Sequence, residues 1–213
     1  MFDSLAIVDG HGSHVIIVHV SYNDMTWREW AAAWFFWLPD FGDRLGPALF
    51  GAETVERLRW IGKDSFYTVG NGPLSTALKA EVAAAAEPVL PYVLKTYVFG
   101  DLLNHVRVTL VMAWRGLWIG NYFGLVGHML AVFGVWHLYR SGRLPVLLCI
   151  AVPAAFMTGL HAFVSVSIPR YNLIQLPYLA VLSAIVMAHL GLAKYADDLF
   201  RGVASTAHFV LLP

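Results

Sequence analysis

The residues best suited to bind a ligand are Arg170 and Tyr171, which follow Pro169 where an apolar helix is expected to begin. An arginine can hold a phosphate through a planar fork of N–H donors. The first turn of a helix adds free backbone N–H groups and a favourable dipole, and the Tyr171 hydroxyl can hydrogen-bond at the same level. The alternative is an arginine that extends to lipid headgroups beside an interfacial tyrosine. Spacing alone leaves both open.

Two arginines and two acids are secondary candidates. Arg107 and Arg115 are expected near the same membrane interface and are further candidates for phosphate binding. Asp40 and Asp43, in the spacing Asp-x-x-Asp, are the best local acids. We interpret them first as a turn and helix-cap pair, and second as a catalytic base or metal ligands. No metal site and no cofactor is assigned.

Four histidines lie in apolar segments: His128, His137, His161 and His189. Histidine inside a membrane invites a haem, metal or proton-relay interpretation. Their expected depths differ, and only His137 and His189 share a level, near the ends of their helices. Histidines at helix ends usually face headgroups, so a haem or metal pair is the lesser alternative.

Three glycines four residues apart, Gly116, Gly120 and Gly124, are typical of close packing between membrane helices. The alternative is a hinge where an interfacial segment turns into a membrane span.

A tryptophan-rich helix is expected after Thr26, because Thr26 and Glu29 match a capping box. The helix carries Trp27, Trp30, Trp34 and Trp37, which fall within an arc of about 80° on a helix, and it stops before Pro39. Tryptophan favours the headgroup layer, so a helix lying flat on the membrane is one interpretation. A stripe buried against the rest of the protein is the other, and both can hold at once.

The expected fold class is an all-α integral membrane protein, because the chain contains few charged residues. Only 13% of the residues are charged and 58% are hydrophobic, against about 25% charged in soluble domains. The formal net charge is zero, so no basic stripe points to nucleic acid. A single cysteine, Cys149, excludes an internal disulfide. Short helices are expected at 52–60, 74–86 and 101–119.

About three transmembrane helices are expected in the second half, since residues 107–193 contain no Asp, Glu or Lys. The predicted spans are residues 121–139, 144–165 and 171–193. Arg140 and Arg143 place the loop between the first two spans in the cytoplasm, and Lys194 and Arg201 place a tail, residues 194–213, on the same side. Residues 1–106 then form an extracytoplasmic, mostly helical interfacial region. No convincing signal peptide precedes it, which suggests a piece of a longer protein.

Several short motifs resemble the C-type multi-spanning glycosyltransferases, the group of protein O-mannosyltransferases and aminoarabinose transferases. The resemblance covers the chain from about Trp27 to about Leu190. The motifs are Ile168–Asn172 with Leu176–Pro177, Trp37–Asp43, and Ala113–Gly116.

The resemblance implies an enzyme of the bacterial inner membrane that moves a sugar from a polyprenyl-phosphate donor to an acceptor at the outer face. Such enzymes have many more helices, and their catalytic carboxylate usually lies in an early outer loop that has no counterpart here. The chain is therefore expected to be a C-terminal fragment, inactive alone, whose partners are membrane lipids, the donor and the missing N-terminal part. The rivals are a non-enzymatic assembly or transporter subunit, and a haem- or quinone-linked protein.

Overall fold

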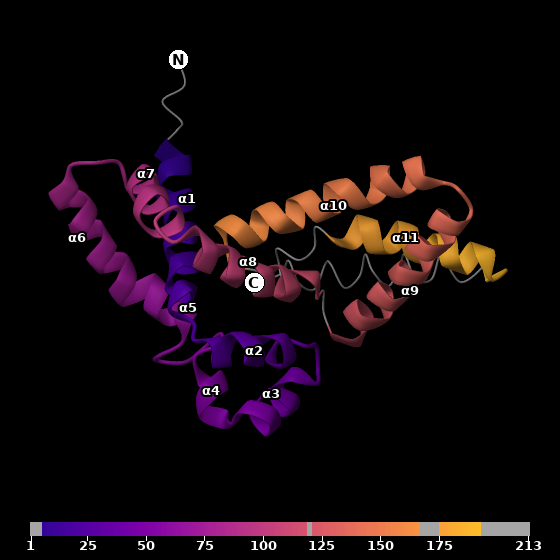
Figure 1. Ribbon diagram of the computed structural model, residues 1–213, viewed down its shortest axis with the longest axis horizontal. Helices are drawn as coiled ribbons and strands as arrows, with labels where there is room; N and C mark the ends of the chain where they lie inside the picture. Colours follow the sequence, from indigo (N-terminus) through magenta and orange to yellow (C-terminus); the bar gives the residue numbers. More distant parts are fainter. Residues whose placement is uncertain (1–5, 119–120, 167–174, 193–213) are drawn as a thin grey trace, which may run out of the picture. The chain divides into compact units, whose positions relative to one another are not determined.

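The computed structural model describes residues 6–118, 121–166 and 175–192 (Figure 1). Their regular structure is entirely helical, without strands, as the sequence predicted. The chain divides into two compact units. The first unit holds the described residues up to Trp114 together with residues 161–166, and the second holds those from Arg115 to Leu160 and from 175 to 192. The units are defined by contacts within the fold and not by the side of a membrane. The predicted boundary at residue 106 between an extracytoplasmic region and a membrane region therefore stays a prediction.

The first unit is built around α1 (Ala6–Val20), which packs against α6 (Ser75–Ala85) and α7 (Val89–Val93) (Figure 1). The sequence did not indicate α1, because its run from Val15 to Val20 is rich in β-branched residues, which have weak helix propensity. Tertiary burial stabilises it instead. The core cluster consists of Ile16, Ile17, Val20, Leu78, Val93 and Val98.

The tryptophan helix is α2 (Trp27–Phe36), and it begins with the predicted capping box. Thr26 Oγ1 accepts from the Glu29 backbone N–H at 3.2 Å, and Glu29 Oε2 accepts from the Thr26 backbone N–H at 2.8 Å. Glu29 is buried and also pairs with Arg57, whose Nη1 lies 3.1 Å from Glu29 Oε1. One carboxylate therefore fixes both the helix start and the loop that carries Arg57.

The three short helices expected from the sequence are present as α4 (Ala52–Glu56), α6 and α8 (Leu102–Leu117). The structure adds α3 (Gly42–Phe50) and α5 (Phe66–Val69), which the sequence did not predict. The predicted 52–60 helix stops at Glu56. Its continuation is replaced by tertiary hydrogen bonds, because the Arg57 carbonyl accepts from the Phe66 N–H at 3.0 Å and the Leu58 carbonyl accepts from Trp37 Nε1 at 3.2 Å.

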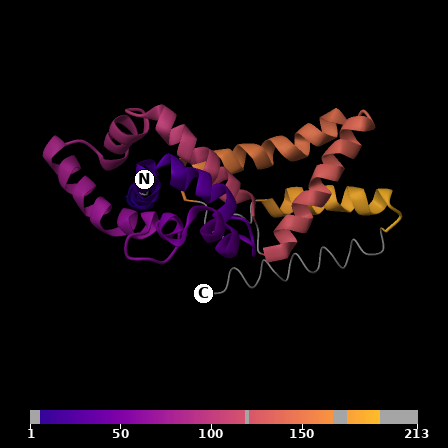
Figure 2. The same cartoon turned by 60° about the horizontal axis from the view of Figure 1, so that its bottom comes forward.

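The second unit contains α9 (Asn121–Arg140), α10 (Leu144–Val164) and α11 (Leu176–His189). Each lies within a predicted span, apart from Arg140; residues 171–174 and 193 of the third prediction lie outside the described residues. Figures 1 and 2 show α9 and α11 crossing at an angle, and the two helices contact each other. Their shared core consists of Ala131, Leu138, Leu179 and Leu182, with Leu147 from α10.

The glycine stripe expected at Gly116, Gly120 and Gly124 is not one continuous surface. Helix α8 ends at Leu117 and α9 begins at Asn121, so Gly116 and Gly124 belong to different helices. Gly120 lies outside the described residues. The close approach is made instead by Gly134, where a Cβ would lie 2.8 Å from the Leu182 carbonyl oxygen of α11. This division agrees with the separate helices expected at 101–119 and 121–139, and with the hinge given as the alternative to a packing stripe. Packing of Gly116 and Gly124 against another membrane helix stays a prediction.

Within the described residues, one helix is long and apolar enough to cross a membrane, and it is α10. Only 6% of its most apolar window is buried inside the protein. Large apolar side chains are exposed along its length: Leu144, Val146, Leu148, Val152, Phe156, Met157 and Leu160. A core helix of a soluble protein would bury most of such a surface.

Candidate functional site

The first unit contains a cluster of aromatic rings and one arginine, which we call the Trp–Arg cluster. Trp27, Trp30 and Trp34 follow one another on α2 in edge-to-face contacts, with centroids 5.7 and 5.5 Å apart. Trp114 of α8 continues the row 5.4 Å from Trp34. The Arg107 guanidinium lies over the Trp27 ring, 4.5 Å from its centroid.

Hydrogen bonds from the indoles dock α2 on α8 in the Trp–Arg cluster. Trp30 Nε1 donates to the Arg107 carbonyl at 2.8 Å, and Trp114 Nε1 donates to the Trp34 carbonyl at 2.9 Å. Trp37 is almost buried, at 9% exposed, and donates to the Leu58 carbonyl at 3.2 Å. The stripe is thus largely a packing surface of this protein.

Trp27 differs from its neighbours, since 69% of its surface is exposed. It stands at the start of α2 and offers a large amphipathic ring to the surroundings. The membrane-interface interpretation therefore stays a prediction, centred on Trp27 rather than on all four tryptophans.

The structure gives Arg107 a structural task. Its guanidinium donates from Nη2 to the Met25 carbonyl, besides its contact with Trp27. A phosphate at Arg107 would have to compete with both interactions. Arg115 is half-buried in the last turn of α8. Arg170 and Tyr171 lie outside the described residues, so the phosphate site proposed from the sequence is not described.

Asp40 lies in the turn before α3, and Asp43 lies in the first turn of that helix. Asp40 has φ 60°, a left-handed conformation that aspartate tolerates better than most residues. The turn interpretation fits, but the helix-cap interpretation is wrong, because the N-cap of α3 is Phe41 and no side chain caps it. Both aspartates are exposed. Across the described residues, no group of three or more His, Cys, Asp or Glu side chains could hold a metal ion.

The sequence missed a buried histidine pair, His19 on α1 and His105 on α8. Their ring centroids lie 4.4 Å apart, and both side chains are fully buried. His19 Nδ1 lies 2.8 Å from the Ser165 carbonyl oxygen, and His105 Nε2 lies 2.9 Å from the Phe163 carbonyl oxygen. A carbonyl can only accept, so these nitrogens carry the protons. The opposite nitrogens, His19 Nε2 and His105 Nδ1, have no hydrogen-bond partner.

Burial keeps this pair neutral. Desolvation, with a smaller contribution from His105, lowers the pKa of His19 from 6.5 to about 3, against the opposing hydrogen bond to Ser165. Desolvation also lowers the pKa of His105, against the hydrogen bond to Phe163. Both imidazoles therefore act at neutral pH as uncharged donors to the backbone that ends α10.

The second unit brings together the two histidines that the sequence placed at one level. The ring centroids of His137 on α9 and His189 on α11 are 4.1 Å apart. His189 is exposed and His137 is half-buried, as expected for side chains at helix ends. His128 instead bonds within α9, its Nδ1 lying 2.8 Å from the Gly124 carbonyl oxygen, beside Trp118.

Comparisons with known proteins add no assignment to these sites. No protein-family model matches the chain, and neither the curated proteins nor the solved structures contain a match. The functional proposal therefore depends on the chain's own residues and on the motif resemblance described above.

Proposed function

We propose that α9, α10 and α11 cross a bilayer and that the chain is the C-terminal membrane part of a glycosyltransferase using a polyprenyl-phosphate sugar donor. Helix α10 supports the membrane step. Its 21 residues extend about 31 Å at 1.5 Å per residue, which matches a hydrocarbon core of about 30 Å. The apolar side chains that α10 exposes are not covered by other described residues. A bilayer would surround them with hydrocarbon instead of water.

The proposed binding of a lipid-linked phosphate is supported mainly by a charge imbalance in residues 107–193. Residues 107–193 contain arginines but no Asp or Glu. Arg170 directly precedes Tyr171 at the expected start of the third span, within the motif that resembles the glycosyltransferases. An anion for Arg170 must therefore come from residues outside this half or from a ligand, and a lipid-linked phosphate brings one to this depth.

The residue roles follow from this arrangement. Arg170 would hold the carrier phosphate through its fork of donors, and Tyr171 would add a hydroxyl. Arg115 is a secondary contact. Arg107 is the weaker candidate, because the Trp–Arg cluster already uses its guanidinium. The catalytic carboxylate would come from a part of the enzyme outside this sequence, and Trp27 would rest in the headgroup layer near the acceptor.

Binding of a short-chain polyprenyl phosphate to the purified full chain in detergent tests the proposal. Charge-assisted contacts contribute about 1.5–3 kcal/mol, so Arg170→Ala should weaken binding by about tenfold to a hundredfold. Arg170→Lys should recover part of the loss, because lysine restores the charge but not the fork. Arg143→Ala, in the exposed loop before α10, is the matched control and should bind like wild type.

Equal affinity across wild type, Arg170→Lys and Arg170→Ala would remove Arg170 from the site. The non-enzymatic membrane subunit would then be the better interpretation. If Arg170→Ala weakened binding and Arg170→Lys restored it fully, Arg170 would contact the carrier phosphate through its charge alone, without the planar fork.

A further inference from the structure

Helices α10 and α11 leave a pocket between them in the second unit. Its volume is about 330 Å³. Its walls come from the middle of α10 and the first turns of α11; they are formed by Cys149, Ile150, Pro153, Ala154, Met157, Pro177, Tyr178 and Val181. We propose that this pocket is a binding site for one acyl chain of a membrane phospholipid, a site that goes beyond the proposed function and depends only on its membrane step.

The depth of the pocket along α10 determines which occupant is possible. Cys149 lies five residues after Leu144, about 8 Å along the axis, and Met157 lies seven residues before Val164, about 10 Å. The pocket therefore occupies the middle of a helix whose length matches the hydrocarbon core. Headgroups do not reach this level, and hydrocarbon chains are the surrounding medium.

The lining selects against water. Tyr178 carries the only side-chain hydroxyl among the lining residues, and no lining side chain is charged. An ordered water usually makes two to four hydrogen bonds, and this lining offers few side-chain partners for them. An unfilled apolar space also costs stability, because its lining atoms lose dispersion contacts. A hydrocarbon chain restores those contacts without requiring a hydrogen bond.

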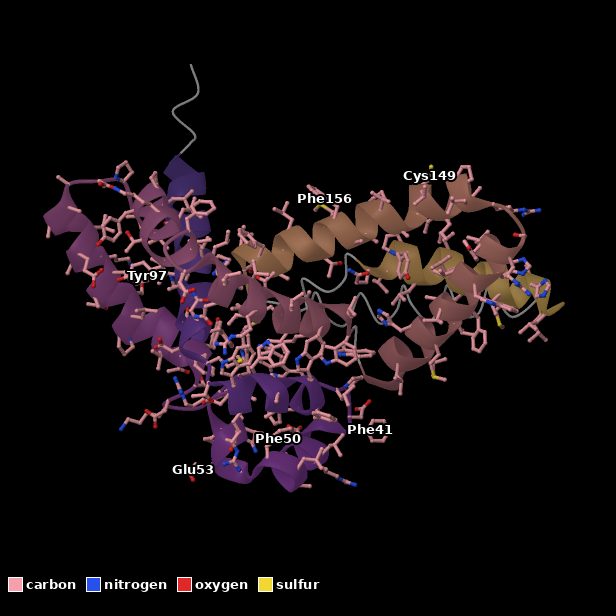
Figure 3. The ribbon with its side chains drawn as sticks, in the orientation of Figure 1. Phe41, Phe50, Glu53, Tyr97, Cys149 and Phe156 are labelled. Atoms are coloured by element: carbon pink, nitrogen blue, oxygen red, sulfur yellow. The ribbon has the colours of Figure 1, made fainter. Side chains whose placement is uncertain are left out.

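Proline and small residues explain why α11 does not close the space. Pro153 stands inside α10 and has no N–H, so the Cys149 carbonyl lacks its usual helical partner. Ala154 and Cys149 present short side chains, and Pro177 occupies the first turn of α11. Cys149 and Met157 are exposed, which leaves the pocket accessible from the outside of the helix pair. Figure 3 shows Cys149 on α10, close to the loop that precedes the helix.

We commit to a phospholipid because acyl chains are the most abundant hydrocarbon at this depth. The test uses the full chain reconstituted in phosphatidylglycerol vesicles that contain a minor fraction of short-chain polyprenyl phosphate. The protein is then extracted in a mild detergent, purified, and analysed by native mass spectrometry. Wild type should retain phospholipid, identified by its mass.

Filling the pocket should remove this lipid. Ala154→Phe places a ring in the pocket and should lower the retained phospholipid about tenfold, a change of about 1.4 kcal/mol in binding free energy. Ala155→Phe is the matched control, since Ala155 is the next residue, is exposed and does not line the pocket. Val181→Phe fills the same space from α11, which keeps the test decisive if Ala154→Phe does not fold.

Three results would overturn the site: no retained lipid in wild type, equal retention in wild type and both filling variants, or a retained polyprenyl phosphate in place of a phospholipid. Arg170→Ala separates this proposal from the proposed function. Loss of polyprenyl-phosphate binding with phospholipid still retained would support both; retained phospholipid with carrier binding unaffected by the substitution would overturn the role of Arg170 alone.

Discussion

Gly134 of α9 faces the backbone of Leu182 in α11 so closely that a Cβ at position 134 would lie 2.8 Å from the Leu182 carbonyl oxygen. It would also lie 3.1 Å from the Leu182 Cβ. The obstacle is mainly backbone, which cannot move aside as the end of a flexible side chain can. The contact sets the distance between α9 and α11.

Gly134→Ala should therefore destabilise the α9–α11 pair by about 1–3 kcal/mol, the usual cost of overpacking. Thermal unfolding in detergent, followed by circular dichroism, measures the loss. Gly127→Ala should be tolerated, because its nearest neighbour is the Leu179 Cδ1 at 3.6 Å. Gly159→Ala, with nothing within 4 Å, is the neutral control on α10. Equal effects of all three would mean that Gly134 does not set the approach.

The capping box of α2 gives a second test, because Glu29 has two tasks that substitution can separate. Glu29→Ala removes both the cap and the buried partner of Arg57. It should lower the free energy of unfolding by about 2–4 kcal/mol. This is less than the full cost of breaking a buried ion pair, because the Arg57 side chain is 39% exposed. Glu29→Gln keeps a side-chain acceptor for the Thr26 N–H but loses the charge, so its cost should be intermediate.

Glu56→Gln is the matched control for the ion pair. Glu56 pairs with Arg59 at 3.0 Å on the surface, and exposed pairs contribute less than about 1 kcal/mol. Denaturant unfolding of the four proteins gives the comparison. If Glu29→Gln were as harmful as Glu29→Ala, the ion pair rather than the cap would dominate.

The buried histidine pair predicts a loss of stability in acid. Since the pKa of His19 falls from 6.5 to about 3 on folding, the unfolded chain binds more protons than the folded chain between these values. The stability is therefore complete above pH 6.5 and is lost as the pH falls towards 3, by up to about 1.4 kcal/mol per pH unit. The lowered pKa of His105 adds to the slope.

The measurement is the free energy of unfolding between pH 7 and 5, a window chosen to stay above the titration of ordinary carboxylates. His19→Leu should be less stable at pH 7, because the Ser165 carbonyl loses its donor, but its stability should depend less steeply on pH. His14, half-buried on the same helix, provides the control variant His14→Leu. Parallel pH profiles for wild type and His19→Leu would show that the pair does not titrate in this way.

The sequence predicted those helices that a capping residue or a long apolar segment marks. It missed the features that depend on contacts between residues far apart in the chain. The capping box at Thr26 and the apolar segments of α9 and α10 need only neighbouring residues to be recognised. Helix α1 was missed because burial against α6 and α7 overrides the weak propensity of its β-branched residues.

The site was predictable only in part for the same reason. His19 and His105 are 86 residues apart, and their partners are backbone carbonyls near residue 165, for which no side-chain pattern exists. The indole bonds of Trp30 and Trp114 are also to carbonyls, so periodicity could place the tryptophans on one face but could not show that α8 covers that face.

The last prediction concerns Cys149 and tests whether α10 crosses a membrane. Cys149 is the only cysteine in the chain and is exposed in the structure. A charged maleimide should label it readily if α10 is surrounded by water. In a bilayer Cys149 would lie about 8 Å inside the hydrocarbon region, which a charged reagent does not enter. We therefore expect no labelling in intact or inverted vesicles, and labelling after denaturation.

Ser141→Cys in a Cys149→Ala background supplies the positive control and the orientation. Ser141 is exposed in the loop between Arg140 and Arg143, which the positive-inside rule places in the cytoplasm. It should label in inverted vesicles and stay unlabelled in intact cells, whereas Ala84→Cys on the exposed face of α6 should label from outside. Labelling of Ser141→Cys in intact cells would reverse the orientation, and rapid labelling of native Cys149 in sealed vesicles would remove α10 from the membrane.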